Sequence, residues 1–216
     1  MNTNPNIPVV PSPGLLLVLS APSGGGKTTL AHRLRAQFPE AKFSVSYTTR
    51  APRGAEVNGR DYHFVDTNTF RDMVESNEFV EWAEVYGHFY GSARRMVDES
   101  YRPQGIAVFD IDVQGGTAIK RKYPDTVQIF ILPPSLEHLE RRLVQRGTDS
   151  DDVIRKRMLS ARAEIERGIQ SYDYLIINDQ LDQAFEELKS IVIAERARRG
   201  RVDLTRMHLQ GLEISG

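Results

Sequence analysis

The segment SAPSGGGKTT, at residues 20–29, carries the clearest chemical signal in the chain. It fits the phosphate-loop pattern G-x-x-x-x-G-K-[ST], with Ala21 at the place of the first glycine and Gly26, Lys27 and Thr28 in register. Glycines let backbone N–H groups turn toward phosphate oxygens, the lysine reaches the β/γ-phosphates, and the threonine hydroxyl can ligate Mg²⁺. The pattern therefore predicts a nucleoside triphosphate site formed by Ala21, Pro22, Ser23, Gly24, Gly25, Gly26, Lys27, Thr28 and Thr29.

Two aspartates, Asp110 and Asp112, end the apolar stretch IAVFDID. On an extended chain, residues two apart point to the same side. A single aspartate in this place is usually a helix cap or a turn residue. A pair beside a phosphate loop favours a role in organising Mg²⁺, and the sequence does not decide which of the two takes it.

A second anion site is indicated by the segment SYTTRAPRGAEVNGRDYHF. Arg50 and Arg53 stand close together in a turn-rich stretch, with Tyr62 downstream. A guanidinium is a planar fork that suits two phosphate oxygens, and a tyrosine hydroxyl adds a donor. Further on, FVEWAEVYGHFYGS places the carboxylate of Glu81 among aromatic residues. The alternatives are solvated surface arginines and a rim carboxylate.

Arginines gather a third time in ERRLVQRGTDSDDVIRKRM. Arg142 and Arg146 precede a Gly-Thr-Asp-Ser turn and Arg157 follows it, so we predict a helical lid over 142–157 that supplies positive charge. Closure of such a lid excludes water, which would otherwise hydrolyse the triphosphate. Two helices with charged outer faces would give a similar pattern.

The elements that must position these residues form an α/β pattern. Short apolar runs at Leu15–Ser20, Ile106–Asp110, Val127–Leu132 and 174–178 predict buried strands. Helical spacing separates them at 28–37, 116–123, 136–143, 151–170 and 183–199. This alternation predicts a parallel sheet with helices on both faces. Residues 46–92 interrupt it with turn signals and aromatics, and predict a small, mostly β insertion with one helix near 68–76.

The predicted organisation is a disordered leader at 1–13, a P-loop core at 14–45 and 93–200, the insertion at 46–92, the lid within the core, and a tail at 201–216. The chain has no cysteine, which excludes disulfides, thiol chemistry and cysteine-based metal centres. Its formal net charge of -1 gives no general attraction to nucleic acid. No apolar run approaches a membrane span or a secretion signal, so we expect a cytoplasmic protein without a membrane partner.

Taken together, these motifs are typical of a single protein family. SAPSGGGKTT, SVSYTTRAPRGAEVNGRDYHF, FVEWAEVYGHFYGS, FDIDVQGG and YDYLIIND occur in the order and at the spacing of the guanylate kinases, and over roughly residues 14–200 the chain resembles the bacterial type. Phe89 stands where many relatives carry a second tyrosine, and Tyr90 is retained. The resemblance implies transfer of the γ-phosphoryl of ATP to GMP, and to dGMP, for guanine nucleotide synthesis and recycling. It implies Mg²⁺ as the cofactor.

The resemblance also implies roles for individual residues. Those that hold the phosphate of GMP would be Arg50, Arg53, Tyr62 and Tyr90. Those that face guanine would be Ser46, Glu81 and Ser92, with Asp110 or Asp112 reading the amino group or organising Mg²⁺. Those that act on the triphosphate, beside the P-loop, would be Arg142, Arg146, Arg157 and, at the adenine edge, Asn178. The catalytic set would be Lys27, Arg50, Arg146 and Arg157, with Thr28 as the protein's metal ligand.

Three other functions remain as alternatives. Guanylate-kinase-like scaffolds that bind phosphopeptides tend to lose the P-loop lysine, and here Lys27 is present. A kinase of a phosphosugar such as ribose 1,5-bisphosphate would not need Glu81 and Ser46 to read a base. A small GTPase would carry an NKxD pattern, which Asn178-Asp179 does not supply. The sequence leaves the oligomeric state open.

Overall fold

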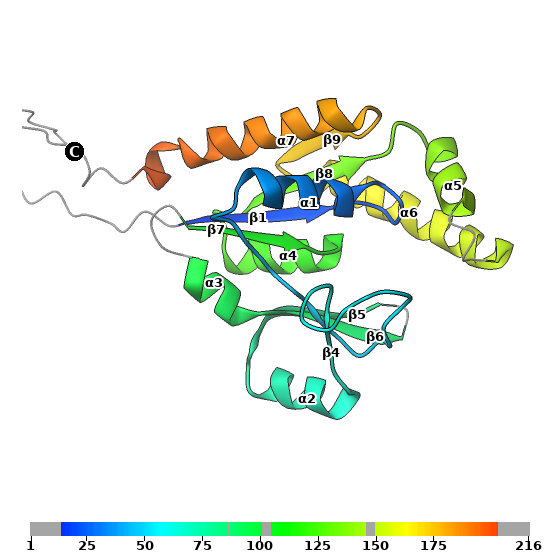
Figure 1. Ribbon diagram of the computed structural model, residues 1–216, viewed down its shortest axis with the longest axis horizontal. Helices are drawn as coiled ribbons and strands as arrows, with labels where there is room; N and C mark the ends of the chain where they lie inside the picture. The colour runs from blue at the N-terminus through cyan, green and yellow to red at the C-terminus, as the bar shows by residue number, and fades with distance from the viewer. Residues whose placement is uncertain (1–13, 86, 101–104, 146–149, 203–216) are drawn as a thin grey trace, which may run out of the picture.

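The centre of the fold is a sheet of five parallel strands (Figure 1). The computed structural model describes residues 14–85, 87–100, 105–145 and 150–202. The strands, in their order across the sheet, are β2 Lys42–Phe43, β7 Ile106–Asp110, β1 Leu15–Ser20, β8 Val127–Leu132 and β9 Tyr174–Ile177. Because the strands run the same way, their carboxyl ends meet at one edge, where ligands bind to sheets of this type.

Helices cover both faces of this sheet, which is why β1 is buried along its whole length. Leu15, Leu17 and Leu19 pack toward one face, and Leu16 and Val18 toward the other. On the first face lie α1 Lys27–Gln37 and α7 Leu181–Arg196; on the second lie α3 Arg94–Ser100, α4 Val113–Lys122 and α6 Asp151–Ser171. The helix α5 Leu136–Gln145 packs against α6. The predicted α/β class with a helix-flanked parallel sheet is confirmed.

A second, smaller sheet lies beside the core, at the bottom of the view in Figure 1. Its strands, in order across the sheet, are β4 His63–Phe64, β3 Tyr47–Thr48, β6 His88–Ala93 and β5 Phe79–Val85. The helix α2 Thr67–Glu75 packs on it through Phe70, whose ring stacks on Phe79 at a centroid distance of 4.6 Å. Asp66 caps this helix by accepting from the N–H groups of Asn68 and Thr69.

Some elements differ from the prediction. The strands predicted from apolar runs are present, whereas the two-residue strand β2 and the helix α3 were not predicted. The helix predicted over 116–123 begins earlier, at Val113, because Asp112 caps it. Arg201, expected to begin the tail, is buried and pairs with Glu195, and its guanidinium donates to the Asp125 carbonyl oxygen at 2.6 Å. The predicted leader and residues 203–216 of the tail lie outside the described residues.

Within the described ranges, no helix is long and apolar enough to cross a bilayer.

Candidate active site

The phosphate loop connects the carboxyl end of β1 to the start of α1. Gly24 and Gly26 both have φ of 93°, a backbone conformation that residues with a Cβ rarely adopt. The Gly25 N–H donates to the Pro22 carbonyl oxygen at 2.8 Å, which closes the turn. Gly26 is the residue before the helix, so Lys27 and the exposed Thr28 are on its first turn. Unpaired N–H groups and the helix dipole make this end of α1 suitable for an anion.

Two of the predicted triphosphate residues hold this loop from behind. The Asn178 side-chain amide donates to the Gly25 carbonyl oxygen at 2.9 Å, and Asn178 is only 5% exposed. The Arg142 guanidinium donates to the Asn178 carbonyl oxygen at 3.2 Å. A Cβ on Gly26 would lie 2.1 Å from the Asn178 amide nitrogen, so the glycine is required by contact as well as by φ. Asn178 thus supports the loop, and its contact with adenine stays a prediction.

Lys27 turns from the loop toward the end of β7. Its ammonium forms an ion pair with Asp110 and donates to the Ile111 carbonyl oxygen at 3.3 Å. Asp112 caps α4 by accepting from the Gly115 N–H at 2.8 Å. Both aspartates line the same cavity, but Ile111 between them lines it too, because β7 ends at Asp110 and Asp112 is already the cap of α4. The Lys27 ammonium is therefore paired with the Asp110 carboxylate, and a bound triphosphate would compete with Asp110 for it.

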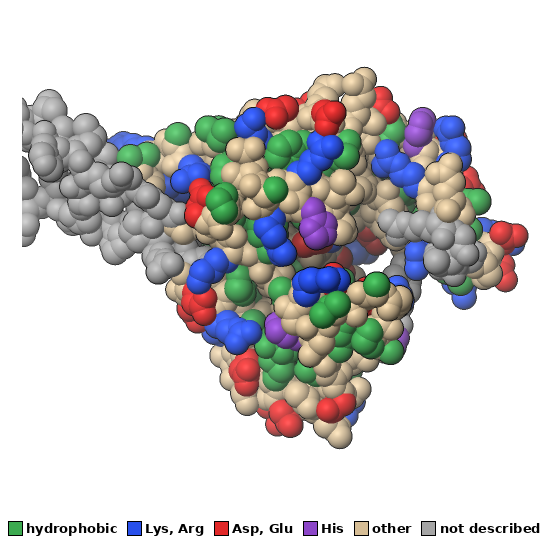
Figure 2. All heavy atoms as spheres, in the orientation of Figure 1, with side chains coloured by type: hydrophobic (Ala, Val, Ile, Leu, Met, Phe, Trp, Pro, Cys, Tyr) green, Lys and Arg blue, Asp and Glu red, His purple; other side chains and the backbone are tan. Residues whose placement is uncertain are grey.

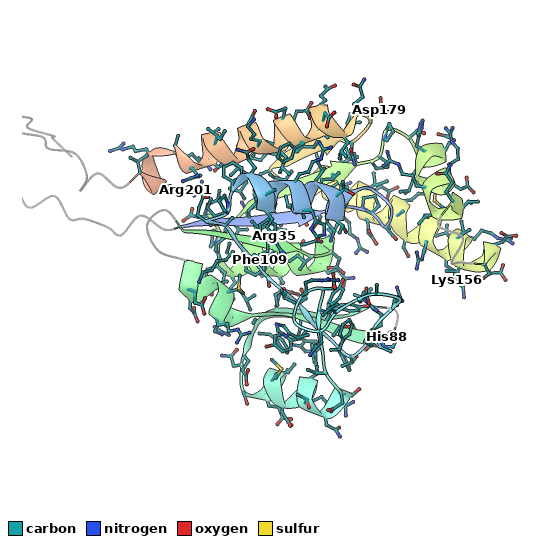
Figure 3. All side chains as sticks on the ribbon, in the orientation of Figure 1. Arg35, His88, Phe109, Lys156, Asp179 and Arg201 are labelled. Carbon is teal, nitrogen blue, oxygen red and sulfur yellow. The ribbon has the colours of Figure 1, made fainter. Side chains whose placement is uncertain are left out.

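A cavity of about 520 Å³ joins the phosphate loop, the second sheet and the first turns of α6. Figure 2 shows the surface hollowed between the second sheet and α6. In Figure 3, His88 of β6 and Lys156 of α6, which both line the cavity, lie on opposite sides of it. Of the predicted site residues, the cavity is lined by Ser23, Lys27, Ser46, Arg53, Tyr62, Glu81, Tyr90, Asp110, Asp112 and Arg157.

Glu81 is a buried carboxylate in the wall of this cavity, 8% exposed. Burial raises its pKa to about 7, and the nearby charge of Asp112 adds to the effect. Ser92 lies directly opposite Glu81 in the β5–β6 ladder and is fully buried. A Cβ on Gly115 would lie 2.9 Å from Glu81 Oε2, so a glycine on α4 leaves the space that this carboxylate occupies. Such a group favours a ligand that brings hydrogen-bond donors.

The two arginines of the second anion site differ in exposure. Arg53 is exposed and lines the cavity. Arg50 is only 7% exposed and does not line the cavity itself; its guanidinium lies over the ring of Tyr62, which does, at 5.1 Å from the ring centroid. Its Nη1 and Nη2 donate to the two oxygens of Glu56 at 2.8 and 3.0 Å. The Tyr62 and Tyr90 rings meet edge to face at 6.1 Å, so the four predicted phosphate contacts are assembled in one place.

Comparison with known proteins agrees with this arrangement. A family model described as guanylate kinase matches residues 14–195. The guanylate kinase of Myxococcus xanthus is 62% identical over 216 residues and covers 100% of both chains. That of Anaeromyxobacter dehalogenans is 56% identical over 193 residues, 88% of this chain and 85% of its own. The crystal structure of guanylate kinase from Anaplasma phagocytophilum has a TM-score of 0.72 at 34% identity, covering 88% of this chain and 90% of its own.

The chain belongs to the guanylate kinase family. It is therefore a nucleotide-binding kinase, and the resemblance seen in its motifs is confirmed.

In this guanylate kinase the predicted lid is described only in part. Arg146 lies outside the described residues. Arg157 lines the cavity, whereas Arg142 lies behind the phosphate loop on the Asn178 side. Val153, Lys156 and Arg157 all line the cavity from α6. Their i, i+3, i+4 spacing puts them on one helical face, a signal that could have drawn attention to Lys156.

Two further carboxylates near the site were not predicted. Burial raises the pKa of Glu164, on α6, to about 7, and the charge of Asp112 adds to the shift. Glu56 pairs with Arg50 and also accepts from the Arg53 N–H at 2.7 Å. The sequence offered no signal for Glu164, because only the fold brings α6 beside Asp112. Glu56 stands in a turn-rich polar stretch, and a carboxylate in such a stretch is usually exposed to solvent.

A buried chain of hydrogen bonds fixes the loop between the two aspartates. The Tyr172 hydroxyl donates to Ser20 Oγ at 2.6 Å, and Ser20 Oγ donates to the Ile111 carbonyl oxygen at 2.8 Å. The same carbonyl accepts from Lys27. Gly116 permits this approach, since a Cβ there would lie 2.3 Å from the Tyr172 hydroxyl oxygen. The end of β1 and the Asp110–Asp112 loop are thus held together from within the core.

Proposed function

We propose that this guanylate kinase transfers the γ-phosphoryl of ATP to GMP and to dGMP in the cytoplasm, giving ADP and the guanosine or deoxyguanosine diphosphate for guanine nucleotide synthesis and recycling. One observation carries the proposal. A single cavity is lined both by the P-loop lysine, Lys27, and by the buried carboxylate Glu81. A phosphate-transfer group and a base-reading group in one cavity are what a nucleoside monophosphate kinase requires.

Glu81 reads the base. Guanine presents N1–H and N2–H₂ donors on one edge, and a carboxylate can accept from both. Adenine lacks this pair of donors, so the buried carboxylate would lose the two hydrogen bonds that guanine supplies, at a cost of about 1–3 kcal/mol or more. Ser46, which is 9% exposed and lines the same cavity, has a hydroxyl that can donate to guanine O6.

The phosphate of GMP binds where Arg53, Tyr62 and Tyr90 line the cavity beside the buried Arg50. Two guanidinium groups and two phenol hydroxyls supply donors in fixed directions. The second pKa of a phosphomonoester is about 6, so the acceptor is mostly dianionic at neutral pH and needs no general base. The task of the site is to bring two polyanions together and to stabilise charge on the transferring group.

The triphosphate of ATP binds on the loop from Ala21 to Thr29 and draws Lys27 from Asp110 to its β/γ-phosphates. Arg157 approaches from α6, and Arg146 belongs to the same proposed lid. Arg142 and Asn178 hold the loop in shape, and Asn178 is near enough to that loop to serve the adenine edge as well.

Mg²⁺ fits this donor set as an ion that arrives with the triphosphate. In the described part of the chain, no group of three or more carboxylates and histidines is arranged to hold a metal by itself. Thr28 is exposed on the first turn of α1, where its hydroxyl can be one ligand beside phosphate oxygens and water. When bound, the ion neutralises charge on the β- and γ-phosphates.

A coupled assay of ADP release tests the proposal. ATP is held constant while GMP, dGMP, AMP, CMP, UMP and ribose 1,5-bisphosphate are compared as acceptors. We expect turnover with GMP and dGMP and rates at least about 100-fold lower with the other acceptors, because none of them presents the adjacent N1–H and N2–H₂ donors of guanine to Glu81. Equal turnover of AMP and GMP would contradict the role of Glu81, and preferred turnover of the phosphosugar would contradict the whole assignment.

A further inference from the structure

The carboxylate of Glu56 stands at the centre of the second anion site. Its Oε2 accepts from Arg50 Nη1 at 2.8 Å and from the backbone N–H of Arg53 at 2.7 Å. Its Oε1 accepts from Arg50 Nη2 at 3.0 Å. The Glu56 N–H in turn donates to the Arg53 carbonyl oxygen at 3.1 Å. One side chain therefore ties together the two arginines whose spacing first suggested a phosphate site.

Arg50 is held on several sides. Its Nη1 also donates to the Ala51 carbonyl oxygen at 2.7 Å, and its guanidinium lies over the rings of Tyr62 and Phe64, at 5.1 and 5.7 Å from their centroids. A side chain of this length loses much rotamer freedom when it is fixed in one place. Glu56 keeps that place in the protein without ligand, since a guanidinium with 7% exposure needs a partner for its charge.

The geometry leaves Arg50 able to serve Glu56 and a phosphate at once. A guanidinium has five N–H groups, and those to Glu56 and Ala51 use three of them, two on Nη1 and one on Nη2. The Nε–H and the second Nη2 N–H form another edge of the same planar fork, and the Tyr90 hydroxyl, itself a predicted phosphate contact, also interacts with this guanidinium. Glu56 fixes the rotation of the guanidinium plane and thereby the direction of that edge.

We propose that Glu56 is a positioning residue for the acceptor phosphate: it orients Arg50 and anchors Arg53, so that the two arginines are arranged before the substrate arrives. The proposal rests on the proposed function, because it takes Arg50 and Arg53 as ligands of that phosphate. Removal of Glu56 should therefore weaken GMP binding. If Glu56 only occupied the place of the phosphate, its removal would free Arg50 and strengthen GMP binding.

The first test is Glu56→Gln, which keeps the length of the side chain and removes its charge and one acceptor. We expect the KM for GMP to rise by about tenfold to a hundredfold, as for the loss of charge-assisted hydrogen bonds, with the KM for ATP unchanged. Inhibition by guanosine, which lacks the phosphate, should keep its wild-type Ki. A KM for GMP that falls or does not change would overturn the proposal, and so would an equal loss of guanosine binding.

The second test is a double-mutant cycle with Arg50→Lys, which keeps the charge and removes the fork. We expect Arg50→Lys to raise the KM for GMP and Glu56→Gln to add little in that background, because Glu56 acts through Arg50. Additive effects would overturn the positioning role alone. An Arg50→Lys variant with a normal KM for GMP would overturn the phosphate site itself, so the two failures are distinguishable.

Asp61→Asn is the matched control. Asp61 is a carboxylate of the same loop that accepts from the Val57 N–H at 2.8 Å and pairs with Arg60. The amide keeps an oxygen that can accept from the Val57 N–H, and Asp61 contacts neither Arg50 nor Arg53 by a hydrogen bond, so the KM for GMP should stay within about twofold. A rise equal to that of Glu56→Gln would attribute the effect to the loop and overturn the proposal. If circular dichroism shows that Glu56→Gln is not folded, Glu56→Asp replaces it: the charge stays, the shorter side chain cannot span both arginines, and the KM for GMP should still rise.

Discussion

The Glu81→Gln substitution should make the protein more stable and the enzyme less active. Burial raises the pKa of Glu81 from 4.5 to about 7, so the ionised side chain opposes folding above that pH. The difference between the two pKa values corresponds to about 3 kcal/mol at pH 8. Glutamine has the same length and no charge to desolvate, so we expect the variant to gain about 2–3 kcal/mol there.

The sign of the pH dependence follows from the raised pKa. The unfolded chain loses the proton near pH 4.5 and the folded protein near 7, so the folded state binds the proton more tightly. The contribution of Glu81 to stability is fully present below pH 4.5 and is lost as the pH rises to about 7. The advantage of the glutamine variant should therefore be absent near pH 4 and reach its maximum above pH 7.

The same substitution should lower activity, because it replaces one carboxylate oxygen of Glu81 by an NH₂ group. Glutamine presents an NH₂ donor to a guanine edge that also carries donors, at a cost of about 1–3 kcal/mol. We expect kcat/KM for GMP to fall by about tenfold to a few hundredfold, discrimination against AMP to narrow, and the KM for ATP to stay unchanged.

Urea unfolding at pH 4, 6 and 8 and steady-state kinetics with GMP and AMP measure both parts. Glu84→Gln, an exposed carboxylate on the same strand, is the matched control and should change neither quantity. A Glu81→Gln protein that is less stable than wild type at pH 8 and has normal GMP kinetics would refute this account of the site.

Three further predictions concern the phosphate loop and its support. Lys27→Ala should reduce kcat by about 100-fold or more, because a charge aimed at the transferred phosphoryl is lost, while circular dichroism stays unchanged; near-normal turnover would contradict the mechanism. Gly26→Ala should abolish ATP binding in calorimetry and lower stability, since the φ of Gly26 is 93° and the new Cβ would meet Asn178. Gly59→Ala also places a Cβ at a positive φ, but its nearest neighbour would be His63 at 3.9 Å, so it should cost only about 1–2 kcal/mol of stability. Tyr172→Phe should lower the free energy of unfolding by about 1 kcal/mol through loss of the hydrogen bond to Ser20, and an unchanged urea midpoint would show that this bond contributes nothing.

The sequence by itself determined the features that short stretches of chain can encode. The glycines and Lys27 of the phosphate loop are consecutive, so strand, turn and helix follow from local residue types. The long buried strands were predictable because apolar runs of that length with turn signals at both ends are typical of buried strands. The two-residue strands β2, β3 and β4 were not predictable, because so short a strand is defined only by its hydrogen bonds to the neighbouring strands.

Tertiary structure alone decided the charge states and the supports of the site. Glu81 acquires its raised pKa from the low-dielectric wall of the cavity and from Asp112, 31 positions along the chain, and Gly115 of α4 leaves room for its carboxylate. Asn178 reaches the Gly25 carbonyl oxygen across 153 positions. Glu56 is only six residues from Arg50, yet its role was not visible, because pairing matters there only once the rings of Tyr62 and Phe64 have excluded water from the guanidinium. A residue type and a spacing specify which groups are available, whereas burial and the fields of distant charges specify what those groups do.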